Sequence, residues 1–195
     1  MSKKILILVV SSNDKPYKQM VKTSLETWDS FEVDNCETMY YFGTPIKDDL
    51  SVYIPNQNPK FIFDDVDERY ENMGRKMLYT FGWVLNNKDF DYIVRINSSC
   101  YCDKKQLAKY IETLPETNVF AGVRIEAGEQ YSKPWLWGGG QFVISKDVIQ
   151  KVVDNKEKFN HGFIEDVALS HLVGDLGIEF TEGVACSINK QENGW

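Results

Sequence analysis

The fold class is decided first by residues 4–14, KILILVVSSND. The run from Ile5 to Val10 is apolar at every position, which is typical of a parallel-sheet strand covered on both faces. Polar residues from Ser11 onward end the run, and Pro16 suits the first turn of a helix, where its missing N–H costs nothing. The order strand, polar turn and helix is that of an α/β domain.

The same alternation continues along the chain. Further strands are expected at residues 37–43, 51–54, 61–63 and 92–96, with helical patterns between them. This order predicts an α/β fold with a mainly parallel sheet flanked by helices. The length of 195 residues suits a single domain with a sizeable core.

For two of the expected helices, the spacing of apolar residues indicates which side is buried. The first, beginning near Asp14, should bury a stripe made of Tyr17, Met20, Val21, Ser24 and Trp28. The second should bury Tyr70, Met73, Met77, Phe81 and Val84, which recur at spacings of three and four. A separate polar line on that helix, either a solvated face or the border of an anion site, carries Arg69, Asn72 and Lys76.

The charge balance excludes several classes of partner. There are 22 Lys and Arg residues against 29 Asp and Glu, which gives a net charge of -7. General binding to nucleic acid or anionic lipid needs a positive surface and is not expected. The first apolar run is too short for a membrane span or a signal peptide, and the four cysteines are expected as reduced thiols, so we expect a soluble cytoplasmic protein.

Three strand ends carry polar residues, and ligands bind at the carboxyl ends of parallel strands. Residues 11–14 suit either a nucleoside or phosphate contact or an ordinary helix cap. The acidic run 64–68, which includes Asp65, suits either metal or ribose contact or capping of the following helix. Arg95 lies inside an apolar strand and needs an anion, which is either an internal carboxylate or a ligand phosphate.

Two later segments also carry residues suited to ligand binding or catalysis. Residues 135–142, WLWGGGQF, place glycines beside indoles, which suits either a sugar ring or a hairpin corner with core tryptophans. Glu165 and Asp166 open a helix, where carboxylates serve either as a general base or as caps.

Four motifs occur in an order known from one group of enzymes. They are Thr27-Trp28, the segment 70–76 (YENMGRK), the segment 138–145 (GGGQFVIS), and Glu165-Asp166-Val167 followed by 176–178 (LGI). Together they resemble the Fringe-like and β-1,3-galactosyltransferase-like glycosyltransferases of the GT-A fold over most of the chain. Leu25 departs from that pattern, which has an arginine there.

The resemblance implies a Rossmann-like GT-A domain over residues 1–195. Residues 1–97 would form its nucleotide-binding half and residues 98–195 its acceptor-binding half. The implied activity is an inverting hexosyltransferase that moves a sugar from a nucleotide-sugar donor, UDP-linked, to a glycan hydroxyl. A viral or microbial source is expected, with the host cytoplasm as location if viral.

The resemblance also implies roles for individual residues. Asp166 is the candidate base and Glu165 its orienting neighbour. Nucleotide contacts are expected from Ser11, Ser12, Asn13, Asp65, Arg69, Lys76, Arg95, Asn97, Ser98 and Ser99, with Lys76 and Arg95 on the diphosphate. The donor-sugar and acceptor floor is expected from Trp137, Gly138, Gly139 and Gly140.

The family's metal-binding Asp-x-Asp signature falls on Asn97-Ser98-Ser99, whose neutral oxygens are poor ligands for Mn²⁺ or Mg²⁺. Either these weaker ligands hold a cation with help from Asp103, or Lys76 and Arg95 neutralise the leaving diphosphate instead. A catalytically silent nucleotide-sugar or glycan-binding protein is the alternative function. A nucleotidyltransferase is disfavoured, because residues 11–15 contain no glycine for a phosphate loop.

Overall fold

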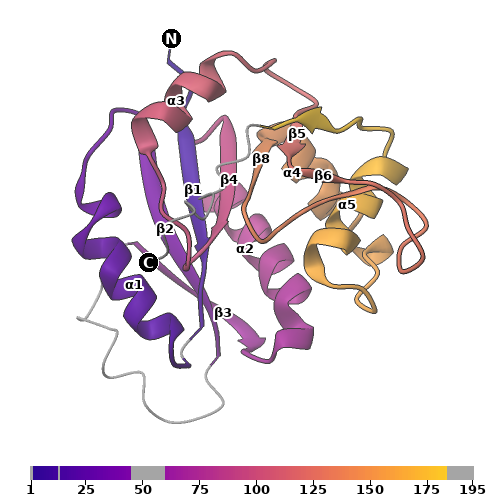
Figure 1. Ribbon diagram of the computed structural model, residues 1–195, viewed down its shortest axis with the longest axis horizontal. Helices are drawn as coiled ribbons and strands as arrows, with labels where there is room; N and C mark the ends of the chain where they lie inside the picture. The colour runs from indigo at the N-terminus through magenta and orange to yellow at the C-terminus, as the bar shows by residue number, and fades with distance from the viewer. Residues whose placement is uncertain (1, 13, 45–59, 184–195) are drawn as a thin grey trace, which may run out of the picture.

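The computed structural model describes residues 2–12, 14–44 and 60–183. It is an α/β sandwich built on a seven-stranded sheet, with strand order β3-β2-β1-β4-β8-β5-β9 and helices on both faces (Figure 1). The strands are β1 (Ile5–Val10), β2 (Cys36–Thr44), β3 (Phe61–Asp67), β4 (Tyr92–Asn97), β5 (Phe120–Gly122), β8 (Gln141–Ser145) and β9 (Thr181–Glu182), with β6 (Arg124–Ile125) and β7 (Trp135–Leu136) forming a separate pair. The helices are α1 (Tyr17–Glu26), α2 (Met73–Asn87), α3 (Lys104–Glu112), α4 (Lys146–Asp154) and α5 (Glu165–Asp175), with short 3₁₀ turns η1 (Trp28–Ser30), η2 (Tyr70–Asn72) and η3 (Lys156–Lys158).

The sheet is mainly parallel, as the sequence predicts. Strand β1 pairs in parallel with both β2 and β4, and β2 with β3. Strand β8 runs antiparallel between β4 and β5. Because β1 and β4 are in register up to Val10 opposite Asn97, the polar residues that follow each strand emerge side by side.

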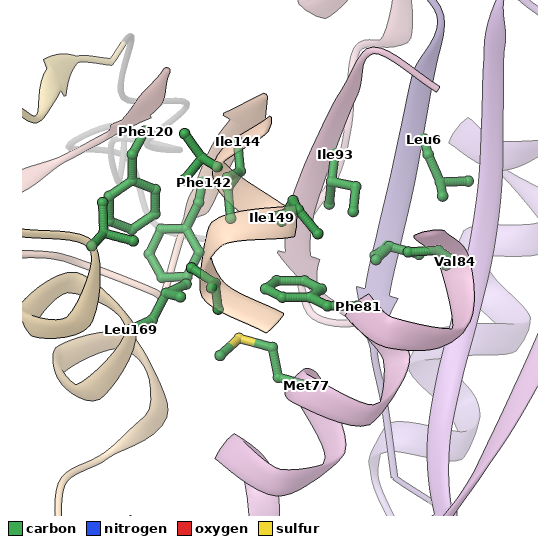
Figure 2. Close-up of a cluster of buried hydrophobic side chains, with 14 of the residues drawn as sticks. Leu6, Met77, Phe81, Val84, Ile93, Phe120, Phe142, Ile144, Ile149 and Leu169 are labelled. Carbon is green, nitrogen blue, oxygen red and sulfur yellow. The ribbon is translucent and has the colours of Figure 1, made fainter. Parts of the chain in front are cut away.

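Alternate residues of β1 divide the core into two layers. Leu6 and Leu8 face α2, α4 and α5, in the cluster that Figure 2 shows around Phe81 and Phe142. Ile7 and its odd-numbered neighbours face α1 and α3 instead. Each fully buried side chain of this size stabilises the fold by about 1.5–3 kcal/mol relative to exposure.

The start of the second helix differs from its prediction. Strand β3 continues to Asp67, so most of the acidic run is strand and does not cap a helix. Helix α2 begins only at Met73, after η2. As a result Tyr70, predicted in the core, is 65% exposed, whereas Lys76, on the predicted polar line, is 4% exposed.

The structure bears out some of the remaining predictions and not others. Val21, Ser24 and Trp28 are buried as expected, but Tyr17 is 43% exposed. Cys36 is a free thiol. The expected strand at 51–54, like Asn13 and Cys186, lies outside the described residues. No helix in the described ranges has the length and apolar character needed to cross a membrane.

Candidate active site

A cavity of about 500 Å³ lies at the carboxyl ends of β1 and β4. The polar turn after β1 and residues 97–99, at the end of β4, form one side. Turn η2 and the start of α2 form a second side, and the segment from Trp135 to Gly139 forms a third together with the first residues of α5. This volume is within the range of small-molecule sites.

The cavity gathers most of the predicted site residues. Those that line it are Ser11, Ser12, Arg69, Lys76, Asn97, Ser98, Ser99, Trp137, Gly138, Gly139, Glu165 and Asp166. Asp65 does not, since it lies in a different cavity with Asn72 and Arg75. Gly140 and Arg95 also lie outside the lining. The sequence gives no site role to Tyr17 and Tyr70, which also line the cavity.

The carboxylate of Asp166 is held by two backbone N–H groups. Its Oδ2 accepts a hydrogen bond from the amide of Gly138 at 2.8 Å, and its Oδ1 one from the amide of Val167 at 2.9 Å. Position 138 requires glycine, because a Cβ there would stand 2.8 Å from the Cβ of Asp166. A carboxylate has about four acceptor positions, so each oxygen keeps capacity for a ligand proton.

Beneath the cavity floor, Arg95 resolves the choice of anion that the sequence leaves open. Its guanidinium is 1% exposed, pairs with Glu165, and donates to the carbonyl of Gly138 at 2.6 Å. The predicted contact of Arg95 with a diphosphate does not fit, because the group faces the protein interior. Burial raises the pKa of Glu165, and the charge of Arg95 acts in the opposite direction.

Lys76 lines the cavity but already has partners. Its Nζ lies 2.5 Å from Glu68 Oε1 and 2.8 Å from the carbonyl oxygen of Ser11. The other oxygen of Glu68 accepts from the amide of Gly43 at 2.5 Å, and burial raises the pKa of this carboxyl. Arg69, the second basic residue of the lining, pairs with Asp67. Both lining cations are therefore neutralised by carboxylates.

A further carboxylate lies behind Lys76. Asp64 is 1% exposed; one oxygen accepts from Thr80 Oγ1 at 2.8 Å, and the other has no hydrogen-bond partner. Burial raises its pKa to about 7, against the opposing effects of Thr80 and Lys76. The sequence shows Asp64 only as one acid in a run, and nothing in the spacing distinguishes it from Asp65.

The residues at the predicted metal position do not form a carboxylate cage. Asn97, Ser98 and Ser99 line the cavity with neutral oxygens. Asp103 caps α3 instead, accepting from the amides of Lys105 and Gln106 at 3.1 and 3.0 Å. No group of three or more His, Cys, Asp or Glu side chains that could hold a metal occurs in the part of the chain that the structure describes. This donor set does not fit a protein-held Mn²⁺ or Mg²⁺.

Solved structures share the architecture at low sequence identity. A 4-diphosphocytidyl-2C-methyl-D-erythritol synthase matches with a TM-score of 0.57 and 12% identity, over 95% of this chain and 91% of that one. The mannosyltransferase PcManGT from Pyrobaculum calidifontis, solved with GDP-Man and Mn²⁺, matches with a TM-score of 0.59 and 12% identity, over 100% of this chain and 59% of that one. The fold is of the GT-A type. The two matches have different activities, so the fold does not fix the reaction.

The sequence matches no protein-family model, but it has distant curated relatives. Lactosylceramide 1,3-N-acetyl-beta-D-glucosaminyltransferase A of Xenopus laevis is 26% identical over 161 residues, which are 70% of this chain and 43% of the relative. Human UDP-GalNAc:beta-1,3-N-acetylgalactosaminyltransferase 2 is 21% identical over 160 residues, 74% of this chain and 31% of the relative. This GT-A chain thus spans less than half the length of these β-1,3-glycosyltransferases. The relatives support the predicted resemblance to glycosyltransferases, and its narrower Fringe-like assignment stays a prediction.

Proposed function

We propose that this chain is an inverting glycosyltransferase that moves a hexose unit from a UDP-linked donor to a glycan hydroxyl. The observation that supports this most strongly is the cavity that places the oriented carboxylate of Asp166 opposite the polar ends of β1 and β4. The relatives, which are named as β-1,3-glycosyltransferases, support the same reaction class.

The nucleoside would lie at the ends of β1 and β4. Hydroxyl and amide groups of Ser11, Ser12, Asn97 and Ser99 surround this part of the cavity and suit a base and a ribose. The acceptor would enter from the side formed by α5 and the glycine turn. This arrangement assigns the nucleotide mainly to residues 1–97 and the acceptor mainly to residues 98–195.

Asp166 would take the proton of the acceptor hydroxyl as that oxygen attacks the anomeric carbon of the donor sugar. The bond from that carbon to the diphosphate breaks on the opposite face, which inverts the configuration. The backbone amides of Gly138 and Val167 fix the carboxylate before substrate binds, so little reorganisation is needed. Glu165 is tied to Arg95 and therefore acts by shaping the floor beside the base.

The leaving diphosphate needs positive charge, and Lys76 is the buried one of the two cations that line the cavity. A phosphate that approaches its Nζ competes with Glu68. Because burial already raises the pKa of Glu68, proton uptake by this carboxyl would release Lys76 to the phosphate. This route uses only residues of the chain and requires no metal ion.

The donor class is tested by calorimetric titration with UDP, GDP and CDP and their hexose conjugates, each in Mn²⁺ and in EDTA. We expect UDP compounds to bind, with an affinity that EDTA leaves within about threefold. Preference for another nucleotide would refute the UDP assignment. A strict need for Mn²⁺ would show that a metal, and not Lys76, neutralises the diphosphate.

The base is tested by Asp166→Asn. We expect near-complete loss of sugar transfer, by a factor on the order of 10²–10⁴ for removal of a general base, with UDP affinity retained. Released UDP in a coupled assay measures turnover, and Ser12→Ala serves as a matched lining variant that should mainly weaken binding. Unchanged turnover in Asp166→Asn would refute the assignment. Tight UDP binding without turnover in the native protein would favour the catalytically silent alternative.

A further inference from the structure

A second cavity, of about 490 Å³, lies beside α2 and has no part in the reaction described so far. The end of β3, the start of α2 and the segment after α4 line it, and it shares no lining residue with the candidate active site. Arg75 and Lys76 are neighbours in α2, yet Arg75 lines this second cavity and Lys76 lines the first. The volume is within the range of small-molecule sites.

Three basic side chains from separate elements meet at the second cavity. They are Arg75 from α2, Lys156 from η3, and His161 from the segment after η3. Arg75 and Lys156 are exposed, and neither forms an ion pair within the described residues. This differs from the candidate active site, where carboxylates neutralise both lining cations. The basic groups of the second cavity therefore remain available to an anion from solution.

Gly74 allows the histidine to approach α2. A Cβ at position 74 would stand 2.7 Å from the ring of Phe159, so a larger residue would push the segment 159–161 away from the helix. His161 packs on Phe159 with ring centroids 5.0 Å apart. Its Nδ1 is buried, stands 3.6 Å from the position of that Cβ, and has no hydrogen-bond partner among the described residues. The other ring nitrogen, Nε2, is thus the one left for a ligand.

The charged groups around His161 make it sensitive to an anion. Burial and the positive charge of Arg75 lower the pKa of His161. Lys156 adds a positive charge from η3, and the end of β3 contributes the carboxylates of Asp65 and Asp67. Asp67 is paired with Arg69, so Asp65 is the unpaired acid of this lining. An anion between Arg75 and His161 would favour the protonated imidazole, because it opposes the charge that disfavours protonation.

We propose that Arg75, Lys156 and His161 form a second ligand site, which binds one phosphate group. The planar guanidinium suits two phosphate oxygens at once, and the ammonium and Nε2 supply further donors. Asp65 and Asp67 at the β3 side repel additional phosphates, so the site suits a compact anion rather than a polyanion. The phosphate is either free inorganic phosphate or part of a small phosphate ester, and the experiment separates the two. The inference does not depend on the proposed glycosyl transfer.

The test uses the two histidines of the chain, whose ring signals are followed by NMR. His171, which packs against Tyr131 and Phe163 and does not line the second cavity, is the internal reference. The probes are inorganic phosphate, glucose 6-phosphate and glucose, titrated separately into the whole chain.

The variants are matched in pairs. Lys156→Ala is compared with Lys158→Ala, since both lysines are exposed in η3 but only Lys156 lines the cavity. Arg75→Met is compared with Lys76→Met, its neighbour in the chain.

We expect the phosphate-bearing probes to shift the His161 signal saturably and to leave His171 in place. Arg75→Met and Lys156→Ala should each weaken this binding about 3–10-fold, while Lys158→Ala and Lys76→Met stay within twofold of the native protein. Tighter binding of glucose 6-phosphate than of phosphate assigns the site to an ester, and equal binding assigns it to free phosphate. Sulfate, whose charge is constant near neutral pH, should move the titration of His161 to higher pH.

A His161 signal that no phosphate-bearing probe shifts would overturn the proposal. So would equal binding in Lys156→Ala and Lys158→Ala, or binding of glucose as tight as that of its phosphate. Arg75→Met should leave UDP affinity unchanged, because Arg75 does not line the candidate active site. Failure of the native protein to bind UDP would instead refute the proposed function, and the His161 titration would still test the second site.

Discussion

Two buried aspartates, Asp29 and Asp64, differ in how fully the nearby cations compensate their charge. Asp29 lies near the amino ends of β1 and β2, in a cavity lined by Ile5 and Cys36. Asp64 is the central residue of β3, and it lies behind Lys76 of the candidate active site. They are 4% and 1% exposed, so their different behaviour comes from their partners.

The negative charge of Asp29 is fully compensated by its partners. Lys104 Nζ lies 2.6 Å from one oxygen and Lys60 Nζ 3.0 Å from the other, and the hydroxyl of Tyr40 is at 3.2 Å. Burial opposes ionisation, but the hydrogen bonds from these lysines prevail and lower the pKa of Asp29. This cluster is a closed structural unit that joins η1 to α3 and to the start of β3.

The negative charge of Asp64 is only partly compensated. It shares one lysine, Lys76, with Glu68, and burial raises the pKa of both acids. The active-site end therefore holds more negative charge than its cations neutralise, so we expect these acids to take up protons when a phosphate enters. Both aspartates are buried, so the compensation of their charge, and not burial itself, distinguishes Asp64 from Asp29.

The largest effect is expected for Arg95→Met, which removes the cation beneath the acid pair. It leaves the 8%-exposed Glu165 without its partner, which costs about 3–5 kcal/mol of folding free energy. The double variant Arg95→Met/Glu165→Gln should recover most of this stability in urea unfolding without recovering turnover. Recovery of both would show that the pair has no positioning role.

Lys104→Met tests the closed cluster at the other end. Asp29 keeps Lys60, so we expect a smaller loss of about 2–4 kcal/mol in urea unfolding, with UDP binding intact. A variant that folds well but no longer binds UDP would contradict the separation of the two ends.

Asp64→Asn should stabilise the protein at pH 8. The pKa of about 7 in the folded state lies above the ordinary 3.8, so the folded protein holds a proton that the unfolded chain has lost between these values. Native stability therefore falls as pH rises from about 4 to 7 and stays lower above it. The amide mimics the protonated acid, and we expect a rise in Tm of roughly 3 °C or more at pH 8, corresponding to about 1 kcal/mol. Equal Tm differences at pH 4 and pH 8 would show that Asp64 is not held protonated.

The smallest expected effect is a pH dependence of UDP binding. An anion beside Lys76 favours the protonated forms of Glu68 and Asp64, whose pKa values burial already raises. Calorimetry should therefore show proton uptake on binding and an affinity that increases several-fold from pH 8 to pH 6. Asp64→Asn should reduce the proton uptake, and an unaltered uptake in that variant would exclude Asp64 from the linkage.

The fold and much of the site could be predicted from local patterns. The apolar run before Ser11 and the acid pair at Glu165 and Asp166 are readable because strand ends and helix starts leave a direct pattern in sequence. The partner of Arg95 and the exposure of Tyr70 could not be predicted from the sequence. The partner of Arg95 is 70 residues away, and the exposure of Tyr70 follows from a 3₁₀ turn that interrupts the helical spacing.

We expect a phosphate-bearing ligand to bind beside Lys76, where the negative charges of Asp64 and Glu68 are only partly compensated. Calorimetric titration of UDP into the native protein, Lys76→Met and Lys60→Met tests it most directly. Loss of a charged hydrogen-bond donor predicts a decrease in affinity of about 10–100-fold for Lys76→Met. Lys60→Met, which removes a lysine from the compensated cluster, should stay within twofold of the native affinity. Equal affinities in the two variants would contradict the claim.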